Sequence, residues 1–345
     1  MNNLSPLRLT TLFLMVCLWS AQAYSAVPEK VSSFQVTRLD RPAPGAPRVP
    51  VVVGVSLSID GTRLITVGDD HRARLWDVAQ NRLIREYTDQ ADWVRSAKFR
   101  PDGVAFVTGG MDHNMYNYNA QTLQREFQYE TANSSVRSLA FSPDSERMAM
   151  VGFDSAVYVY ETTYGRLLRK WNTTCQDQRC VVFSPDSRYL VAAGGDGNVR
   201  IFDVTTGAVV KDLRYHKRRV NTLAFSPDGK FLATGGDDRK VFVWSMSDFR
   251  LVRSYDYPSG KVSSMTFCGN NMLAAGAANN TIRVWDIRSE SAEAVFYMDE
   301  HRGTVAELVW DAQNETLISC SFDTTVRFWK ISVSGVASRT HSIVH

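Results

Sequence analysis

The sequence predicts an all-β fold, a propeller built from seven copies of one repeat. The first observation is an aromatic residue that recurs every 41 to 44 residues, at Trp76, Tyr118, Tyr160, Phe202, Trp244, Trp285 and Trp329. The second is a carboxylate or amide six residues before each aromatic, at Asp70, Asp112, Asp154, Asp196, Asp238, Asn279 and Asp323. Because a period in the forties made of short strands is typical of propellers, we expect one blade per copy.

The fifth copy, 216–244, shows how one repeat is built. An apolar segment is followed by a Pro-Asp-Gly turn, a second apolar segment, a turn that carries Asp238, and a third segment that ends on Trp244. Runs of strand-forming residues separated by turn residues predict three short strands. The other copies follow the same plan, so residues 50–334 are expected to form one domain.

Two short motifs add to the period. Phe-Ser-Pro-Asp stands at the first turn of three copies, at 141–144, 183–186 and 225–228, and a Trp-Asp pair survives at 76–77 and 285–286. Over roughly residues 50 to 330 the chain therefore resembles the WD40 repeat family. The resemblance implies a seven-bladed β-propeller of four-stranded antiparallel blades around a central channel, closed by pairing one end of the chain with the blade formed by the other.

One outer strand is missing from the count. Seven copies supply the three inner strands of seven blades, but only six segments lie between copies. We expect the seventh outer strand to come from Ser33–Leu39 rather than from Val336–Val344, because Ser33–Leu39 has the better strand residues and leads into a loop with four prolines, 40–50. Residues 27–49 are thus predicted to hold the closing strand and the linker, and 335–345 a C-terminal tail.

The first 26 residues have the composition of an export signal. Arg8 precedes a short apolar run, 12–19, and Ala21-Gln22-Ala23 offers a small-x-small cleavage site. We expect cleavage after Ala23, with Ala26 as the second choice, and a protein exported to the periplasm or the extracellular space. The apolar run is shorter than the roughly 20 residues of a membrane span, so no span is predicted.

The charge balance argues against nucleic acid as a partner. The formal net charge of +3 falls to +2 when Arg8 is removed with the signal, which is near neutral for a chain of this size. A protein or peptide partner is expected instead, and the oligomeric state stays open.

Two copies carry a full set of polar residues that the resemblance assigns to a structural hydrogen-bonded tetrad. The sets are His216, Thr234, Asp238 and Trp244, and His301, Ser319, Asp323 and Trp329. An indole N–H can donate to the hydroxyl, which bonds His, which bonds the carboxylate. Reading the same residues as a hydrolytic triad is disfavoured, because no nucleophile-elbow motif exposes a hydroxyl.

The remaining copies depart from this set. Met150, Ala192 and Ala275 replace the hydroxyl in copies three, four and six, so these blades are expected to rely on packing alone. His71 and His113 follow the turn Asp of neighbouring copies, but no third ligand stands at matching spacing, so neither a metal nor a cofactor is predicted. Cys175 and Cys180 form a candidate disulfide beside the fourth copy.

The resemblance also implies which rim binds a partner, namely the one bearing the turn Asp and the loop that leads into each innermost strand. There the sequence places Trp93, Met111, Phe153 and Phe322, and the basic residues Lys217, Arg219 and Lys261. Aromatic and cationic anchors dominate protein interfaces. We therefore expect an exported scaffold without catalytic activity that binds a protein on this rim. The alternative is a periplasmic-type propeller enzyme or small-ligand binder with its site in the channel.

Overall fold

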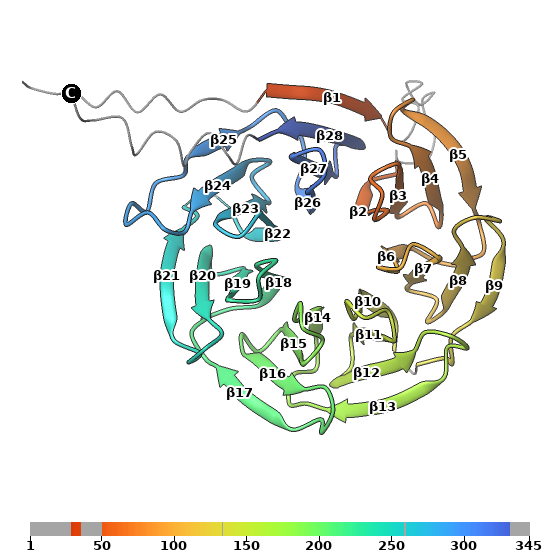
Figure 1. The fold of residues 1–345 in the computed structure, drawn as a ribbon, viewed down its shortest axis with the longest axis horizontal. Coiled ribbons are helices and arrows are strands. Elements are labelled where there is room, and N and C mark those ends of the chain that lie inside the picture. The colour runs from red at the N-terminus through yellow and green to blue at the C-terminus, as the bar shows by residue number, and fades with distance from the viewer. Residues whose placement is uncertain (1–28, 36–49, 133, 259, 332–345) are drawn as a thin grey trace, which may run out of the picture.

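The computed structural model of this chain describes residues 29–35, 50–132, 134–258 and 260–331. The predicted signal segment, its cleavage site, most of the proline-rich linker and the C-terminal tail lie outside these residues. The described chain forms a ring of seven blades, and each blade is a four-stranded antiparallel sheet (Figure 1). The predicted all-β, seven-bladed propeller is confirmed.

Each blade runs outward from the central channel in strand order, and blades 1 to 7 follow the chain. The innermost strands are β2 (Val52–Leu57), β6 (Val94–Phe99), β10 (Val136–Phe141), β14 (Gln178–Phe183), β18 (Val220–Phe225), β22 (Val262–Cys268) and β26 (Val305–Asp311). The second strands are β3 (Arg63–Gly68), β7 (Ala105–Gly110), β11 (Arg147–Gly152), β15 (Tyr189–Gly194), β19 (Phe231–Gly236), β23 (Met272–Ala277) and β27 (Thr316–Ser321).

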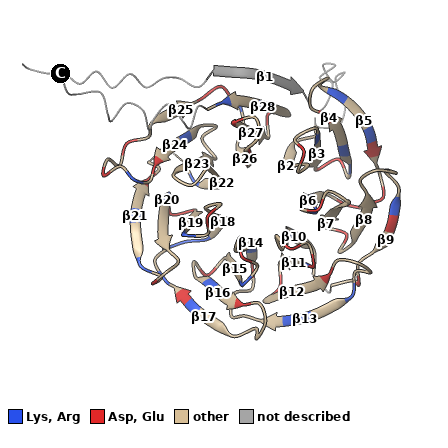
Figure 2. Cartoon of the chain, in the orientation of Figure 1, with Lys and Arg blue, Asp and Glu red and all other residues tan. Residues whose placement is uncertain are grey.

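The third strands carry the recurring aromatic residue. They are β4 (Ala73–Asp77), β8 (Met115–Asn119), β12 (Ala156–Glu161), β16 (Val199–Asp203), β20 (Lys240–Ser245), β24 (Ile282–Asp286) and β28 (Thr325–Lys330). The outer strands are β5 (Arg82–Tyr87), β9 (Arg125–Gln128), β13 (Leu167–Asn172), β17 (Val209–Leu213), β21 (Leu251–Asp256), β25 (Phe296–Met298) and β1 (Glu29–Gln35). Outer strands such as β5, β9 and β17 carry charges of both signs (Figure 2).

Blade 7 receives its outer strand from the other end of the chain. β1 pairs antiparallel with β28, from Glu29 opposite Lys330 to Gln35 opposite Thr325. The strand expected at 33–39 overlaps β1 only at 33–35, and residues 36–39 lie outside the described residues. The alternation of polar and apolar residues shows which side chains share a face of the strand, but not where pairing with the neighbouring strand starts. The predicted strand therefore begins too late in the sequence.

The turns explain why the repeat needs its motif. In blade 5, Ser226 Oγ donates to Asp228 Oδ1 at 2.7 Å, and Gly229 follows with φ of 70°. The short polar side chain closes the turn between the first two strands, and glycine adopts the left-handed conformation at little cost. The sequence Phe-Ser-Pro-Asp-Gly therefore specifies one tight turn through local interactions alone.

The apolar core is divided into seven clusters, and each cluster joins two neighbouring blades. One example buries Tyr255 of blade 5 against Trp285 of blade 6, with ring centroids 5.0 Å apart. Another joins the two ends of the ring by packing Val55 and Trp76 of blade 1 with Phe328 of blade 7. The recurring aromatic residue thus marks the interface between blades, which is why its period reports the fold.

Candidate protein-binding rim

The rim that bears the turn Asp residues is called the Asp-turn rim below. The same backbone hydrogen bond recurs there from blade to blade. The N–H of the residue before the turn Asp donates to the carbonyl of the residue before the innermost strand. The bond joins Met111 to Trp93 (2.8 Å), Gly195 to Asp177 (2.7 Å), Asp237 to Arg219 (2.8 Å), Ala278 to Lys261 (2.9 Å) and Phe322 to Thr304 (3.0 Å). In these five blades the residue before the turn Asp or Asn therefore lies beside the residue before the innermost strand, on one rim.

In blade 5 the four polar residues form one continuous hydrogen-bonded chain. Trp244 Nε1 donates to Thr234 Oγ1 at 3.2 Å, and Thr234 Oγ1 lies 2.8 Å from His216 Nε2. His216 Nδ1 lies 2.9 Å from Asp238 Oδ2, which also accepts the N–H of Lys217 at 3.0 Å. Because the Thr234 hydroxyl accepts from the indole, its own hydrogen is free to donate to His216 Nε2. His216 Nδ1 then carries the ring hydrogen and donates it in a hydrogen bond to Asp238.

Blade 7 repeats the chain with serine in place of threonine. Trp329 Nε1 donates to Ser319 Oγ at 2.9 Å, Ser319 Oγ lies 2.8 Å from His301 Nε2, and His301 Nδ1 lies 2.9 Å from Asp323 Oδ2. Burial by itself raises the pKa of the Asp323 carboxyl. The hydrogen bonds from His301, Thr325 and the N–H of Arg302 outweigh that effect and hold the pKa below its ordinary value.

Blade 2 holds a tetrad-like set that a histidine-based pattern does not find. Gln90 stands 28 residues before Tyr118, as His216 stands before Trp244. With its amide nitrogen 2.9 Å from Asp112 Oδ2, Gln90 accepts from Thr108 Oγ1 at 3.2 Å. The offset of 28, searched without regard to residue type, is the signal that finds it.

The expectation that copies three, four and six rely on packing alone is wrong. In blade 3, Tyr158 Oη donates to Asp154 Oδ2 at 2.6 Å, and in blade 4 Arg200 Nη2 contacts Asp196 Oδ2 at 2.6 Å. In blade 6, Tyr257 stands at the histidine offset and bonds Thr281 Oγ1 at 2.8 Å. A polar side chain from another position therefore bonds the turn carboxylate in blades 3 and 4 and Thr281 in blade 6, so hydrogen bonds supplement packing in all three blades.

An aromatic sector occupies the Asp-turn rim of blades 2 and 3. Trp93 is 39% exposed and Phe153 43% exposed, while Met111 is half-buried. The guanidinium of Arg95 lies 4.8 Å from the centre of the Trp93 ring. The main chain of Met111 joins blade 2 to blade 3 by accepting from Ser135 Oγ at 3.1 Å. Trp93, Met111 and Phe153 are called the aromatic sector below.

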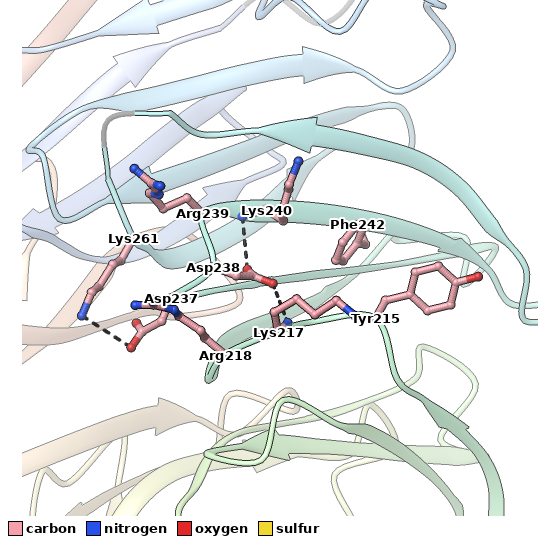
Figure 3. Close-up of a pocket in the computed structure, with 9 residues that line it drawn as sticks. All are labelled: Tyr215, Lys217, Arg218, Asp237, Asp238, Arg239, Lys240, Phe242 and Lys261. Carbon is pink, nitrogen blue, oxygen red and sulfur yellow. Dashed lines mark hydrogen bonds and ion pairs between the residues drawn. The ribbon is translucent and has the colours of Figure 1, made fainter.

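A basic pocket of about 590 Å³ lies on the same rim in blade 5 (Figure 3). It is lined by Tyr215, Lys217, Arg218, Asp237, Asp238, Arg239, Lys240, Phe242 and Lys261. Lys261 Nζ reaches Asp237 Oδ2 at 3.5 Å, and Asp238 accepts the N–H groups of Lys217 and Lys240 (Figure 3). Five cations therefore surround two carboxylates that already have partners.

The structure divides the predicted rim residues into these two sectors and leaves two outside. Lys217 and Lys261 line the basic pocket, whereas Arg219 lies 3.4 Å from Asp177 Oδ2 and is not among its lining residues. Phe322, 42% exposed, belongs to blade 7 and is separated from the aromatic sector by blade 1. Sequence reasoning missed Arg218, Arg239 and Lys240, although the runs 217–219 and 239–240 are basic.

The two histidines considered as a metal pair have separate surroundings. His71 Nε2 lies 3.9 Å from Asp92 Oδ1, and His113 Nε2 lies 3.3 Å from Ser135 Oγ. Across the described residues, no group of three or more histidine, cysteine or carboxylate side chains is arranged to hold a metal ion. None of the described segments forms a helix of the length and apolarity needed to cross a membrane.

The candidate disulfide is not formed, and Cys175 and Cys180 are both free and buried. Cys175 Sγ lies 3.5 Å from the carbonyl of Asp177 in the loop, while Cys180 Sγ lies 3.7 Å from the carbonyl of Ala193 on the next strand. Proximity in sequence failed as a guide because one cysteine lies in the loop and the other in strand β14, and each thiol contacts a different carbonyl group.

Two curated relatives match a short stretch of the chain. A ribosome biogenesis protein WDR12 homolog from Nematostella vectensis is 40% identical over 62 residues, which is 17% of this chain and 15% of the relative. Periodic tryptophan protein 2 from Arabidopsis thaliana is 38% identical over 60 residues, which is 17% of this chain and 6% of the relative. These matches thus span a small fraction of either relative's length.

Two family profiles match the chain. The profile described as WD domain, G-beta repeat matches residues 47–77. The profile described as Nucleolar protein 10-like, N-terminal domain, matches residues 86–340, which is more than half of the chain.

The prediction of an exported protein, in the periplasm or the extracellular space, is contradicted by these comparisons. The family matched over most of the chain is described as nucleolar protein 10-like, and the Nematostella relative is named for ribosome biogenesis. The prediction depended on the composition of residues 1–26 alone. An arginine, a short apolar run and two alanines are too general a pattern to assign a compartment.

The seven blades and the two profiles lead to one assignment. The chain has the WD40 repeat in its sequence and the corresponding propeller in its structure. It belongs to the WD40-repeat β-propellers and, among them, to the family described as Nucleolar protein 10-like, N-terminal domain.

Proposed function

We propose that this propeller is a scaffold that binds another protein on its Asp-turn rim, without catalytic activity. The single observation that carries the proposal is the coexistence on that rim of an exposed aromatic sector and a basic pocket. A partner segment that is acidic and carries an apolar anchor is complementary to both. The name of the Nematostella relative makes ribosome-assembly proteins the first class of partner to search.

The aromatic sector is suited to be the anchor. Exposed aromatic side chains grouped together are a common mark of an interaction site. Stacking of Arg95 on Trp93 holds the indole in one orientation, so less conformational entropy is lost when a partner covers it. Trp is also among the residues that contribute most to binding energy at interfaces.

The basic pocket is suited to an acidic segment. Asp238 is engaged by His216, and Asp237 by Lys261 and by Asn221 Nδ2 at 2.9 Å. Among the described residues, no carboxylate pairs with the side chain of Lys217. Unneutralised cations at a pocket wall attract an acidic partner and speed its approach.

The polar chains beneath the rim favour architecture over catalysis. Thr234 and Ser319 are both 0% exposed, and each hydroxyl is held between an indole and an imidazole. A nucleophile must reach its substrate, and these hydroxyls are covered. Neither curated relative carries the name of an enzyme.

Replacing Trp93 or Phe153 with Ala should weaken partner capture by about 2 kcal/mol each, or about 30-fold. The partner is first identified by cross-linking the tagged full chain in cells and mass spectrometry, and its affinity is then measured by calorimetry. Treatment with ribonuclease before capture distinguishes a protein partner from RNA. A complex that disappears on this treatment would contradict the proposal.

Tyr164→Ala is the matched control for the aromatic sector. Tyr164 is 69% exposed and lies on the turn between β12 and β13, at the opposite rim of blade 3. The Tyr164 variant should bind as the wild type does. Folded Trp93 and Phe153 variants that keep full affinity would move the docking surface away from this rim.

Lys217→Ala and Lys261→Ala should mainly slow association, by several-fold at low salt, and leave dissociation nearly unchanged. Stopped-flow kinetics at two salt concentrations measure both rates. The difference from wild type should shrink at high salt, because the Debye length falls to about 8 Å at physiological ionic strength and further above it. Unchanged association rates at low salt would remove the basic pocket from the docking surface.

A further inference from the structure

Every innermost strand contains the same irregularity at its second residue. The register between first and second strands skips one position there, so that one residue per blade has no partner across the ladder. These bulge residues are Val53, Arg95, Arg137, Arg179, Asn221, Ser263 and Ala306. A β-bulge redirects a side chain, and all seven line one cavity of about 350 Å³ in the central channel.

Three adjacent blades place arginine at the bulge. Arg95, Arg137 and Arg179 stand 42 residues apart in blades 2, 3 and 4, whereas the other four bulge residues are uncharged. The cavity also contains Lys98 and Glu307, which pair with each other, and Glu307 Oε2 accepts the N–H of Val55 at 2.7 Å. The only carboxylate among the lining residues is therefore engaged by other groups, and the positive charge gathers on one side of the channel.

The three guanidinium groups differ in how they are held. Arg95 stacks on Trp93, and Arg179 Nε lies 2.9 Å from Asp177 Oδ1. Arg137 has no hydrogen-bond or ion-pair partner among the described residues, and its Nε is buried, as is that of Arg95. Burial, followed by the charges of Arg179 and Arg95, lowers the pKa of Arg137 to about 10, so it remains a cation at neutral pH.

Arg137 is half-buried, and its buried Nε without a partner is costly unless something binds it. We propose that Arg95, Arg137 and Arg179 form a site in the central channel for a small phosphate-bearing anion. Guanidinium groups donate two parallel hydrogen bonds to phosphate oxygens, and Arg95 and Arg137 each have an Nε without a partner for such a pair of bonds. Arg179 already donates from Nε and Nη2 to Asp177, so it contributes charge and its remaining N–H groups. The cavity size limits the bound group to a small anion or a single phosphorylated side chain.

This site goes beyond the proposed scaffold function and lies in a different cavity from the basic pocket. The channel cavity and the basic pocket of blade 5 share no lining residue. Arg95 is shared with the docking surface, because it also stacks on Trp93 of the aromatic sector. The experiments below therefore change Arg137 instead, so that the two proposals can fail independently.

Calorimetry and thermal unfolding of the full chain with sodium pyrophosphate, in a buffer free of phosphate and sulfate, test the site. The wild type should bind one pyrophosphate and melt at a higher temperature when it is present. Arg137→Met should bind at least tenfold more weakly and lose that increase. Without pyrophosphate the Arg137→Met variant should melt at or above the wild-type temperature, because a half-buried, unpaired cation is gone.

Arg137→Lys and Lys261→Met complete the experiment. Arg137→Lys keeps the positive charge but loses the paired N–H donors of the guanidinium, so it should also bind pyrophosphate about tenfold more weakly. This variant tests the site if Arg137→Met does not fold. Lys261→Met removes one charge from the basic pocket and should bind as the wild type does. Wild-type binding by Arg137→Lys, loss of binding in Lys261→Met alone, or no binding by the wild type each overturns the proposal.

A phosphoserine peptide, Gly-Ser-phosphoserine-Gly-Ser, distinguishes the two sources of the phosphate group. Tighter binding of the peptide than of pyrophosphate indicates a phosphorylated protein as the source, and the reverse ranking indicates a free compound. The unphosphorylated peptide should not bind, and equal binding of both peptides contradicts recognition of phosphate.

Discussion

Deleting residues 29–35 is expected to destabilise the whole ring and cause aggregation. β1 pairs with β28 over six residue pairs, and this ladder ties the start of the chain to blade 7. With about 1 kcal/mol of net stabilisation per hydrogen bond, several kcal/mol are lost out of the roughly 5–15 kcal/mol that hold a domain together. The exposed edge of β28 also invites pairing with another chain. Thermal unfolding and size-exclusion chromatography measure both effects.

Deleting residues 335–345 is the matched control, because it shortens the other end of the chain by a similar length. That variant should elute as the wild type does and melt within a few degrees of it. If the two truncations rank in the opposite order, the C-terminal segment supplies the closing strand and the pairing of β1 with β28 is wrong.

Asp323→Ala should lower the free energy of unfolding by about 2–4 kcal/mol, and Asp238→Ala by a similar amount. Each variant removes the acceptor for a buried imidazole and for a backbone N–H, and an orphaned buried donor costs about 1–3 kcal/mol. Chemical denaturation followed by tryptophan fluorescence measures the loss. Asp256→Ala is the control, since Asp256 forms only an exposed ion pair with Lys240, worth about 0–1 kcal/mol.

Acid should reproduce the effect of Asp323→Ala in the wild type. The folded-state pKa of Asp323 lies below its ordinary value of about 3.9, so its contribution is complete above that pH and is lost as the pH falls toward the folded-state pKa. The stability difference between wild type and Asp323→Ala should therefore shrink below about pH 4. A difference that stays constant down to pH 3 contradicts the role of the charged carboxylate.

The fold could be predicted because each blade is specified locally. Trp244, Asp238 and the turn 225–228 fall within one repeat of about forty residues, so seven such signals fix the number of blades. The closing strand was placed four residues too late because its partner, β28, lies at the far end of the sequence. No local pattern in residues 29–39 indicates at which residue the pairing with β28 begins.

The candidate site was predicted less completely because it depends on which side chains converge. The loops that lead into the innermost strands of copies five and six identified Lys217 and Lys261. They did not identify Arg239, which follows the turn Asp with φ of 64° and joins them in one pocket. For the channel, given above as the alternative site, the sequence does not show which charged side chains converge. The 42-residue spacing of Arg95, Arg137 and Arg179 was visible, but only the bulge shows that these residues point inward.

The division of the core into seven clusters has a consequence for the order in which the chain folds during synthesis. Six clusters join blades that are consecutive in sequence, so each can form soon after its second blade leaves the ribosome. The seventh packs Val55 and Trp76 against Phe328, and its seam includes the bond from Val55 to Glu307, 252 residues away. An incomplete chain can therefore form an open arc of blades, but the ring closes only after translation of its last strand.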